Sequence, residues 1–248
     1  MGGRRSWGDV ITLLEKDGYR VIAVQNPLTS FADDVATTRR VIDAQDVSVV
    51  LVGHSYGGAV ITSAALGAGN VSALVYIAAF GPDTGESLQA VLEEYPSKIG
   101  AAVVPDAEGF LYIDRAKFKE AFAGDVSDRQ RSVVAAAQKP INAQIFGHTL
   151  ESPAWKEIRS WYLVASDDQA INPALQRMFA QRMGATTREV KASHVPFVSK
   201  PAAVVGIIEE AAQAALQPAT ALRAWRRFRS RCANRHPQTN YWSVGLPC

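Results

Sequence analysis

The sequence predicts an α/β fold: a mostly parallel, doubly wound sheet with helices on both faces and an inserted helical lid. Short apolar or β-branched runs alternate with segments whose apolar residues recur every three or four positions, as in buried strands and amphipathic helices. Parallel strands need crossover connections, which helices usually supply. One stretch of about 80 residues interrupts the alternation and predicts the insertion. The 248 residues, 48% of them hydrophobic, can bury one substantial core.

The expected elements follow the chain in order. Strands are predicted at residues 20–24, 48–52, 74–78, 161–165 and 187–191, and helices at residues 7–16, 30–44, 56–66, 173–183 and 201–216. The lid should contain helices near residues 87–94, 116–123 and 128–138, and it shows no convincing long strand. We therefore expect a core of residues 1–81 and 159–217, a helical lid at 82–158 and an irregular basic tail at 218–248.

A candidate nucleophile lies between the second strand and its helix. The run from Val47 to Val60 joins a buried strand, the turn Gly53-His54-Ser55-Tyr56-Gly57 and the start of a helix. This is the context of the nucleophile elbow of α/β-hydrolases, in which the sharp turn requires small neighbours. A helix N-terminus also favours developing negative charge. We predict that Ser55 is the nucleophile and that the backbone N–H of Tyr56 is an oxyanion donor.

The general base must come from four histidines. In this fold the chain order is serine, acid, histidine. His54 lies in the turn itself, His148 in the expected lid and His236 in the tail, which leaves His194. It follows the strand at 187–191 by a short loop, at the carboxyl end where sites of such sheets lie. His194 is the predicted base.

The acid should follow the strand at 161–165, where Asp167 and Asp168 are adjacent. We choose Asp168, because the usual arrangement in these enzymes is an aspartate, two variable residues, then an aliphatic residue with a proline nearby. Ile171 and Pro173 fit that spacing. Asp167 is interpreted as a solvated turn residue or a helix cap. Asp168 would hold the imidazole in its productive tautomer.

Several strings resemble one group of known enzymes. They lie at residues 24–30, 53–62, 73–80, 109–114 and 192–195. They are similar to the small bacterial α/β-hydrolases described as methyl-ester carboxylesterase-like, and more distantly to plant methylesterases and hydroxynitrile lyases. The resemblance covers about residues 5–216. It implies a carboxylic-ester substrate, no cofactor, and a helical lid that shapes an apolar pocket.

Aromatic side chains of the expected lid are candidates for the walls of that pocket. They are Phe110, Tyr112, Phe146 and Trp155, although such residues also form a lid's own small core. Tyr56 is a further candidate, since the side chain after the nucleophile can face the substrate.

The chain departs from the resemblance at both ends. Members of that group begin with an apolar strand and a His-Gly oxyanion loop, whereas residues 1–7 look like the stretch that follows. We expect that the native protein is longer, in preference to a member with weakened activity. From about Gln217 the resemblance stops. We interpret the Arg-rich stretch as a disordered extension or a frame-shifted end rather than a nucleic-acid or membrane arm.

Composition narrows the function further. Six arginines lie in residues 218–248 without any acid, so the remaining chain is mildly acidic and predicts no nucleic-acid partner. The only cysteines, Cys232 and Cys248, lie in the same stretch, and we expect no thiolate nucleophile and no metal. No apolar run approaches the roughly 20 residues of a membrane span, and a signal-like segment is not evident. The default expectation is a cytoplasmic protein.

These features together predict hydrolysis of small-molecule carboxylic esters through a Ser-His-Asp triad and an acyl-enzyme. Two alternatives stay open. One is a lyase of the hydroxynitrile type, which a suitably placed lid lysine would favour; the candidates are Lys98, Lys117, Lys119, Lys139 and Lys156. The other is a ligand-binding member of the fold with weakened catalysis.

Overall fold

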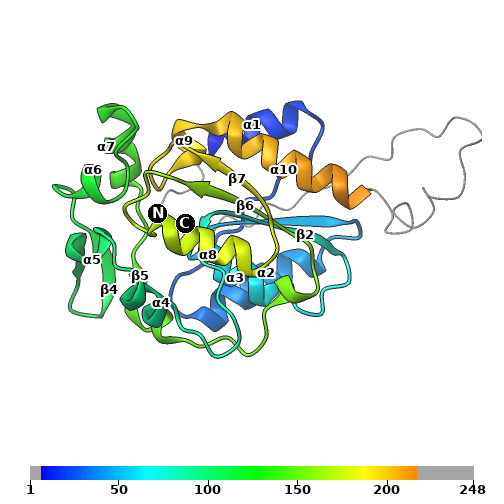
Figure 1. The fold of residues 1–248 in the computed structure, drawn as a ribbon, viewed down its shortest axis with the longest axis horizontal. Coiled ribbons are helices and arrows are strands. Elements are labelled where there is room, and N and C mark those ends of the chain that lie inside the picture. The colour runs from blue at the N-terminus through cyan, green and yellow to red at the C-terminus, as the bar shows by residue number, and fades with distance from the viewer. Residues whose placement is uncertain (1–6, 217–248) are drawn as a thin grey trace, which may run out of the picture.

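A four-stranded parallel sheet forms the centre of the computed structural model, which describes residues 7–216 (Figure 1). Its strands lie in the order β1-β2-β6-β7. They are β1 (Val49–Ser55), β2 (Val71–Ala79), β6 (Ser160–Ala165) and β7 (Thr186–Val190). The parallel sheet confirms the predicted fold class. Residues 1–6 and the basic tail with Cys232 and Cys248 lie outside the described residues.

Helices cover both faces of the sheet because its strands are apolar on both sides. Val49 and Leu51 belong to one buried cluster, whereas Val50 and Val52 belong to the other. The first cluster contains α2 (Phe31–Asp43), α3 (Gly57–Ala64) and α8 (Pro173–Arg182). The second contains α1 (Gly8–Lys16) and α10 (Pro201–Leu216), which lie side by side on the opposite face (Figure 1). These five helices were predicted.

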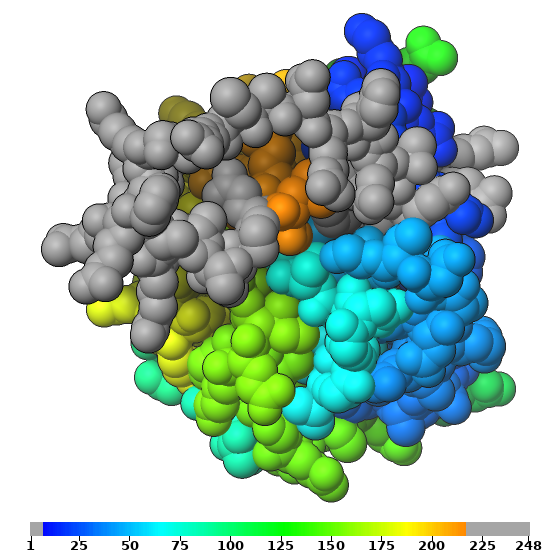
Figure 2. Space-filling model, turned by 90° about the vertical axis from the view of Figure 1, so that its right-hand side faces the viewer, coloured from blue at the N-terminus to red at the C-terminus, as the bar shows by residue number. Residues whose placement is uncertain are grey.

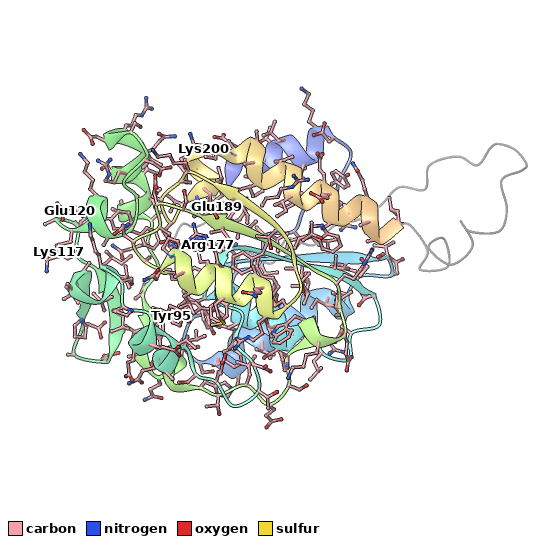
Figure 3. The ribbon with its side chains drawn as sticks, in the orientation of Figure 1. Tyr95, Lys117, Glu120, Arg177, Glu189 and Lys200 are labelled. Carbon is pink, nitrogen blue, oxygen red and sulfur yellow. The ribbon has the colours of Figure 1, made fainter. Side chains whose placement is uncertain are left out.

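Local sequence signals account for where two of these helices begin. Ser30 caps α2 by accepting a hydrogen bond from the Asp33 N–H at 3.1 Å, and Asn172 caps α8 by accepting from the Ala174 N–H at 2.9 Å. Pro173 occupies the first position of α8, where a missing N–H costs nothing. Arg177 of α8 also pairs with Glu189 of β7 at 2.6 Å, which ties this helix to the last strand (Figure 3).

The predicted strand at residues 20–24 is wrong. The structure has a single bridge position at Arg20 and no strand at residues 21–24. A strand needs a neighbour for its backbone hydrogen bonds, and β1 is the edge strand of the described sheet. Residues 21–24 are apolar enough for a strand, but they pair with none of the strands in residues 7–216.

Most of the predicted lid, residues 82–158, lies at one end of the sheet, where Figure 1 labels α4–α7. Its helices are α4 (Leu88–Glu94), α5 (Ile99–Ala102), α6 (Phe118–Ala121) and α7 (Asp128–Ala136), with short 3-10 turns at Ala143–Gly147 and Ala154–Lys156. It also contains a small antiparallel sheet of β3 (Val103–Pro105), β4 (Phe110–Ile113) and β5 (Ile141–Asn142). The sequence analysis did not predict this sheet, because strands of two to four residues carry too little periodicity.

Segments far apart in the sequence meet at the end of the molecule opposite helices α4–α7 (Figure 1 and Figure 2). Figure 2 shows this end, where blue and cyan segments from the first third of the chain lie against the light green segment that leads into β6. The 3-10 turn at Ala154–Lys156 contacts α3 there. Among residues 7–216, no helix is both long and apolar enough to cross a membrane.

Candidate active site

The turn between β1 and α3 places Ser55 at the carboxyl end of the sheet. Ser55 is the last residue of β1 and has a φ of 54°, in the left-handed region that non-glycine residues rarely adopt. A Cβ at Gly53 would lie 2.6 Å from the Gly57 carbonyl oxygen, and one at Gly58 would lie 2.1 Å from the Phe80 carbonyl oxygen. Side chains at these two positions would therefore force this strained turn to open.

Asp168 and His194 meet at the same edge of the sheet. Asp168 follows β6 and His194 follows β7, and the His194 Nδ1 lies 2.7 Å from the Asp168 Oδ2. Both residues are 1% exposed. The second carboxylate oxygen, Oδ1, accepts hydrogen bonds from the backbone N–H groups of Ala170 at 2.7 Å and Ile171 at 3.0 Å. The loop therefore orients the carboxylate toward the imidazole ring.

Gln176 is a buried partner of this pair that the sequence analysis missed. Its Nε2 donates to the Asp168 Oδ2 at 2.7 Å and to the Ile171 carbonyl at 2.8 Å, while its Oε1 accepts from the Ala165 N–H at 2.9 Å. Its side chain is fully buried. The available signal was a polar residue beside Leu175 on the buried side of α8, because such a residue requires polar partners.

Ser55 and His194 both line a cavity of about 410 Å³ beneath the lid. Among residues 7–216, no hydrogen bond joins the Ser55 hydroxyl to the imidazole. Nucleophile–base contacts are often long in unliganded enzymes and shorten when substrate binds. Phe122 of the lid packs edge-on against His194, with 4.7 Å between ring centroids. Ser193 donates a hydrogen bond to Asp125 of the lid, so lid residues hold the histidine loop from two sides.

His54 contacts His194 through a hydrogen bond and through its ring. The His54 Nε2 lies 2.7 Å from the backbone oxygen of His194, and the two ring centroids are 4.6 Å apart. Burial, followed by the adjacent His194, holds the pKa of His54 well below its usual 6.5. A neutral imidazole can donate its Nε2–H to this carbonyl. Phe197 packs against the His54 ring, and Trp7 stacks on Phe197 at 4.3 Å.

The lid contributes most of the cavity wall, and only part of the predicted set of aromatic residues lies there. Tyr112 and Phe146 line the cavity, whereas Phe110 and Trp155 are not among its lining residues. Trp155 is buried in the core cluster, and its indole N–H donates to the Pro82 carbonyl at 3.0 Å. Apolar side chains that complete the wall include Leu92, Ile99, Leu111, Phe122, Ile141 and Ile171.

Tyr56 lies at the start of α3, but its side chain does not face the cavity. Its backbone N–H belongs to the first turn of the helix, where N–H groups lack partners within the helix. The side chain is buried, and its hydroxyl donates to the Asp34 Oδ2 at 2.8 Å. The expectation that the Tyr56 ring faces the substrate is therefore wrong, because a buried carboxylate of α2 holds it on the other side.

One of the five lid lysines reaches the cavity. Lys139 lines it and donates a hydrogen bond to the Asn26 carbonyl. Lys117, at the outer side of the lid (Figure 3), donates to the Ala101 carbonyl at 2.6 Å. Lys156 pairs with Asp83 at 2.5 Å. The residues in the described part of the chain form no group of three or more histidine, cysteine or carboxylate side chains that could hold a metal ion.

Comparison with known proteins identifies the family. Residues 2–207 match the alpha/beta hydrolase family, and the chain belongs to that family. This result confirms the predicted fold class and the predicted hydrolase class. The alpha/beta hydrolase nvfD of Aspergillus novofumigatus is 29% identical over 236 residues, which cover 84% of this chain and 91% of that protein.

Two further proteins are similar over different lengths. A carbendazim hydrolyzing esterase of Nocardioides sp. is 44% identical over 66 residues, which cover 25% of this chain and 27% of that protein. The crystal structure of a pyrethroid hydrolase from Sphingobium faniae JZ-2 has a TM-score of 0.73 and 23% identity, covering 86% of this chain and 93% of that one. The structural likeness shows a shared fold.

Proposed function

We propose that the protein hydrolyses carboxylic esters of small molecules, with Ser55 as nucleophile, His194 as general base and Asp168 as the acid that orients the base. One observation carries the proposal. Asp168 and His194 form a buried pair joined at 2.7 Å, and His194 lines the same cavity as Ser55. Membership of the alpha/beta hydrolase family and the relative named as an esterase support the same reaction.

The reaction follows from the roles that these groups can perform. His194 takes the proton of the Ser55 hydroxyl, and the Ser55 Oγ attacks the acyl carbon. The Tyr56 N–H donates to the developing oxyanion. Asp168 accepts the Nδ1–H and stabilises the imidazolium, which then protonates the departing alcohol. Water, activated by His194, attacks the acyl-enzyme and releases the acid.

The cavity supports small substrates with apolar acyl or alcohol groups. Its volume of about 410 Å³ lies within the range of about 300–1,000 Å³ that is usual for small-molecule sites. The polar side chains in its wall, besides Ser55 and His194, are Gln89, Glu93, Tyr112, Gln138 and Lys139. Apolar groups can therefore be buried against the lid, with few polar contacts to fix their orientation.

A lyase of the hydroxynitrile type is a second candidate, and Lys139 is the observation that favours it. The same His194 would take the hydroxyl proton of a cyanohydrin, and a cavity lysine would stabilise the departing cyanide. We rank it second because Lys139 is already bonded to the Asn26 carbonyl.

A nucleophile-specific label tests the proposal. A fluorophosphonate probe should modify the wild-type protein, and labelling and ester cleavage should both disappear in Ser55→Ala. Ser63→Ala, on α3 and outside the cavity wall, is the matched control and should keep both. Ester cleavage that persists in Ser55→Ala would contradict the proposal. Cyanide release from cyanohydrins without ester cleavage would favour the lyase.

A further inference from the structure

Asp34 is a buried carboxylate that takes no part in the proposed triad. It lies in α2, and its residue is 0% exposed. Its Oδ2 accepts the Tyr56 hydroxyl at 2.8 Å, and its Oδ1 accepts the Leu28 N–H at 2.8 Å. Burying a carboxylate is costly unless its oxygen atoms are hydrogen-bonded. Both carboxylate oxygen atoms of Asp34 accept a hydrogen bond. One bond comes from Tyr56, next to Ser55, and the other from Leu28.

The two partners of Asp34 belong to strained parts of the backbone. Leu28 has a φ of 62°, and Ser55, directly before Tyr56, has a φ of 54°. Side-chain-bearing residues persist in this left-handed region only where surrounding contacts hold them. Asp34 bonds one of these residues directly and bonds the neighbour of the other. Asp34 is therefore placed to restrain both backbone segments, the one at Leu28 and the turn at Ser55.

The hydrogen bond between Tyr56 and Asp34 fixes the Tyr56 side chain. Burial and the neighbouring Asp34 raise the pKa of the Tyr56 hydroxyl, so it stays protonated and remains a donor. The bond is 2.8 Å long, the ordinary length of an O–H···O hydrogen bond, and both of its residues are buried. The Tyr56 ring is fixed at its far end by this bond, and its backbone N–H is the proposed oxyanion donor.

The segment at residues 26–28 connects the same carboxylate to the lid. The Leu28 carbonyl accepts the N–H of Asn142 in β5 at 3.0 Å, and the Asn26 carbonyl accepts the ammonium of Lys139. Asp34 and the lid thus hold opposite sides of one short segment. Lys139 also lines the cavity that contains Ser55.

We propose that Asp34 is a positioning residue for ester hydrolysis: through the Tyr56 hydroxyl it fixes the oxyanion N–H, and through Leu28 it joins that donor to β5 of the lid. The inference rests on the proposed function. Asp34 acts through Tyr56 and Leu28 and has no contact with the reacting atoms.

Tyr56→Phe tests the inference by removing only the hydroxyl. We expect kcat to fall about tenfold while KM stays within about twofold, less than the 100- to 1,000-fold loss that follows removal of an oxyanion donor itself. Thr38→Val is the matched control. Thr38 lies one turn further along α2, is 1% exposed, and donates to the Asn26 Oδ1 at 3.2 Å. This variant should lower the melting temperature but keep kcat, because among residues 7–216 the Thr38 hydroxyl has no hydrogen bond to Tyr56 or Asp34.

Asp34→Asn and the double variant complete the test. Asp34→Asn should also lower kcat at nearly constant KM, and it decides the question if Tyr56→Phe does not fold. The kcat of the double variant should be little lower than that of the more impaired single variant, because both substitutions remove the same Tyr56–Asp34 hydrogen bond. Unchanged kcat in the single variants, or an equal loss in Thr38→Val, would overturn the positioning role while Ser55-dependent hydrolysis stands. Hydrolysis that does not depend on Ser55 would overturn the proposed function and this inference together.

Discussion

The Nε2 of His54 lies 2.7 Å from the backbone carbonyl oxygen of His194, so the histidine of the nucleophile turn holds the backbone of the proposed base. The bond joins residues 140 positions apart and connects the end of β1 to the loop after β7. Because burial lowers the pKa of His54, the ring is neutral at neutral pH and keeps this donor. In the proposed reaction, the positive charge on His194 is therefore not opposed by a second charge on His54.

Acid should destabilise the protein through His54. Below about pH 6.5 an exposed histidine of the unfolded chain binds a proton that the buried His54 does not bind, so the unfolded state gains protons first. The free energy of unfolding should then fall by up to about 1.4 kcal/mol per pH unit as pH drops from 6.5 toward the lowered pKa of the folded state. His54→Gln should reduce this slope, because its amide can donate to the His194 carbonyl but does not titrate.

Urea denaturation at pH 7.5 and pH 5.5 measures the difference. The control is His148→Gln, since His148 is exposed and belongs to the lid. Equal pH dependence in wild type and His54→Gln would show that His54 does not cause the acid sensitivity.

The two adjacent aspartates after β6 should differ sharply in their effect on turnover. Asp168→Asn should lower kcat by about 10,000-fold, because an amide at this position no longer orients and stabilises the protonated imidazole. Asp167 is exposed, and its described hydrogen bonds involve its backbone: its N–H donates to the Ala192 carbonyl at 3.1 Å, and its carbonyl accepts from the Gln169 Nε2 at 3.4 Å. Asp167→Asn should therefore keep kcat. Steady-state kinetics with one ester decides between the two positions, and a larger loss in Asp167→Asn would reverse the assignment.

Gln176 should contribute to both stability and turnover. Gln176→Leu leaves the Ala165 N–H and the Ile171 carbonyl unpaired in the core and removes one donor from Asp168. We expect a loss of about 3 kcal/mol in unfolding free energy, since each unpaired buried group costs about 1–3 kcal/mol. Turnover should fall as well.

The neighbouring residue supplies the control for Gln176. Arg177→Gln removes the exposed pair with Glu189 (Figure 3), and such pairs contribute at most about 1 kcal/mol. Denaturation curves and kcat of both variants test the comparison. A Gln176→Leu protein as stable and active as Arg177→Gln would contradict the role of the buried amide.

Phe146 and Phe110, two of the phenylalanines in the predicted lid, should affect substrate choice differently. Phe146→Ala enlarges the cavity, so the kcat/KM ratio of a bulky over a small ester should rise by about tenfold, the effect of about 1.4 kcal/mol of pocket packing. Phe110 lies in β4 outside the cavity wall, and Phe110→Ala should leave this ratio unchanged. A series of esters of increasing chain length measures both ratios. A shift in the kcat/KM ratio for Phe110→Ala but not for Phe146→Ala would mean that the substrate does not bind in this cavity.

Local patterns carried the predictions that the structure confirms. The strand-turn-helix run around Ser55 and the periodic segments of α2, α8 and α10 are encoded in consecutive residues, so they can be read from the sequence without a fold. Residues 20–24 show the limit of this approach. Their apolar character allows a strand, but strand formation depends on a neighbour that the local sequence does not specify.

The sequence by itself was enough to predict the α/β class and the strand-turn-helix run at Ser55. The positions of the histidines and aspartates along the chain were enough to choose His194 and Asp168 as candidates. The tertiary structure alone decided that Tyr56 faces Asp34, that Gln176 supports Asp168, and which of Phe110, Tyr112, Phe146 and Trp155 line the cavity. The physical reason is the distance along the chain over which each kind of interaction acts. Periodicity and turn chemistry act between near neighbours, whereas these contacts join residues that come together only when helices pack on the sheet and the lid closes over its edge.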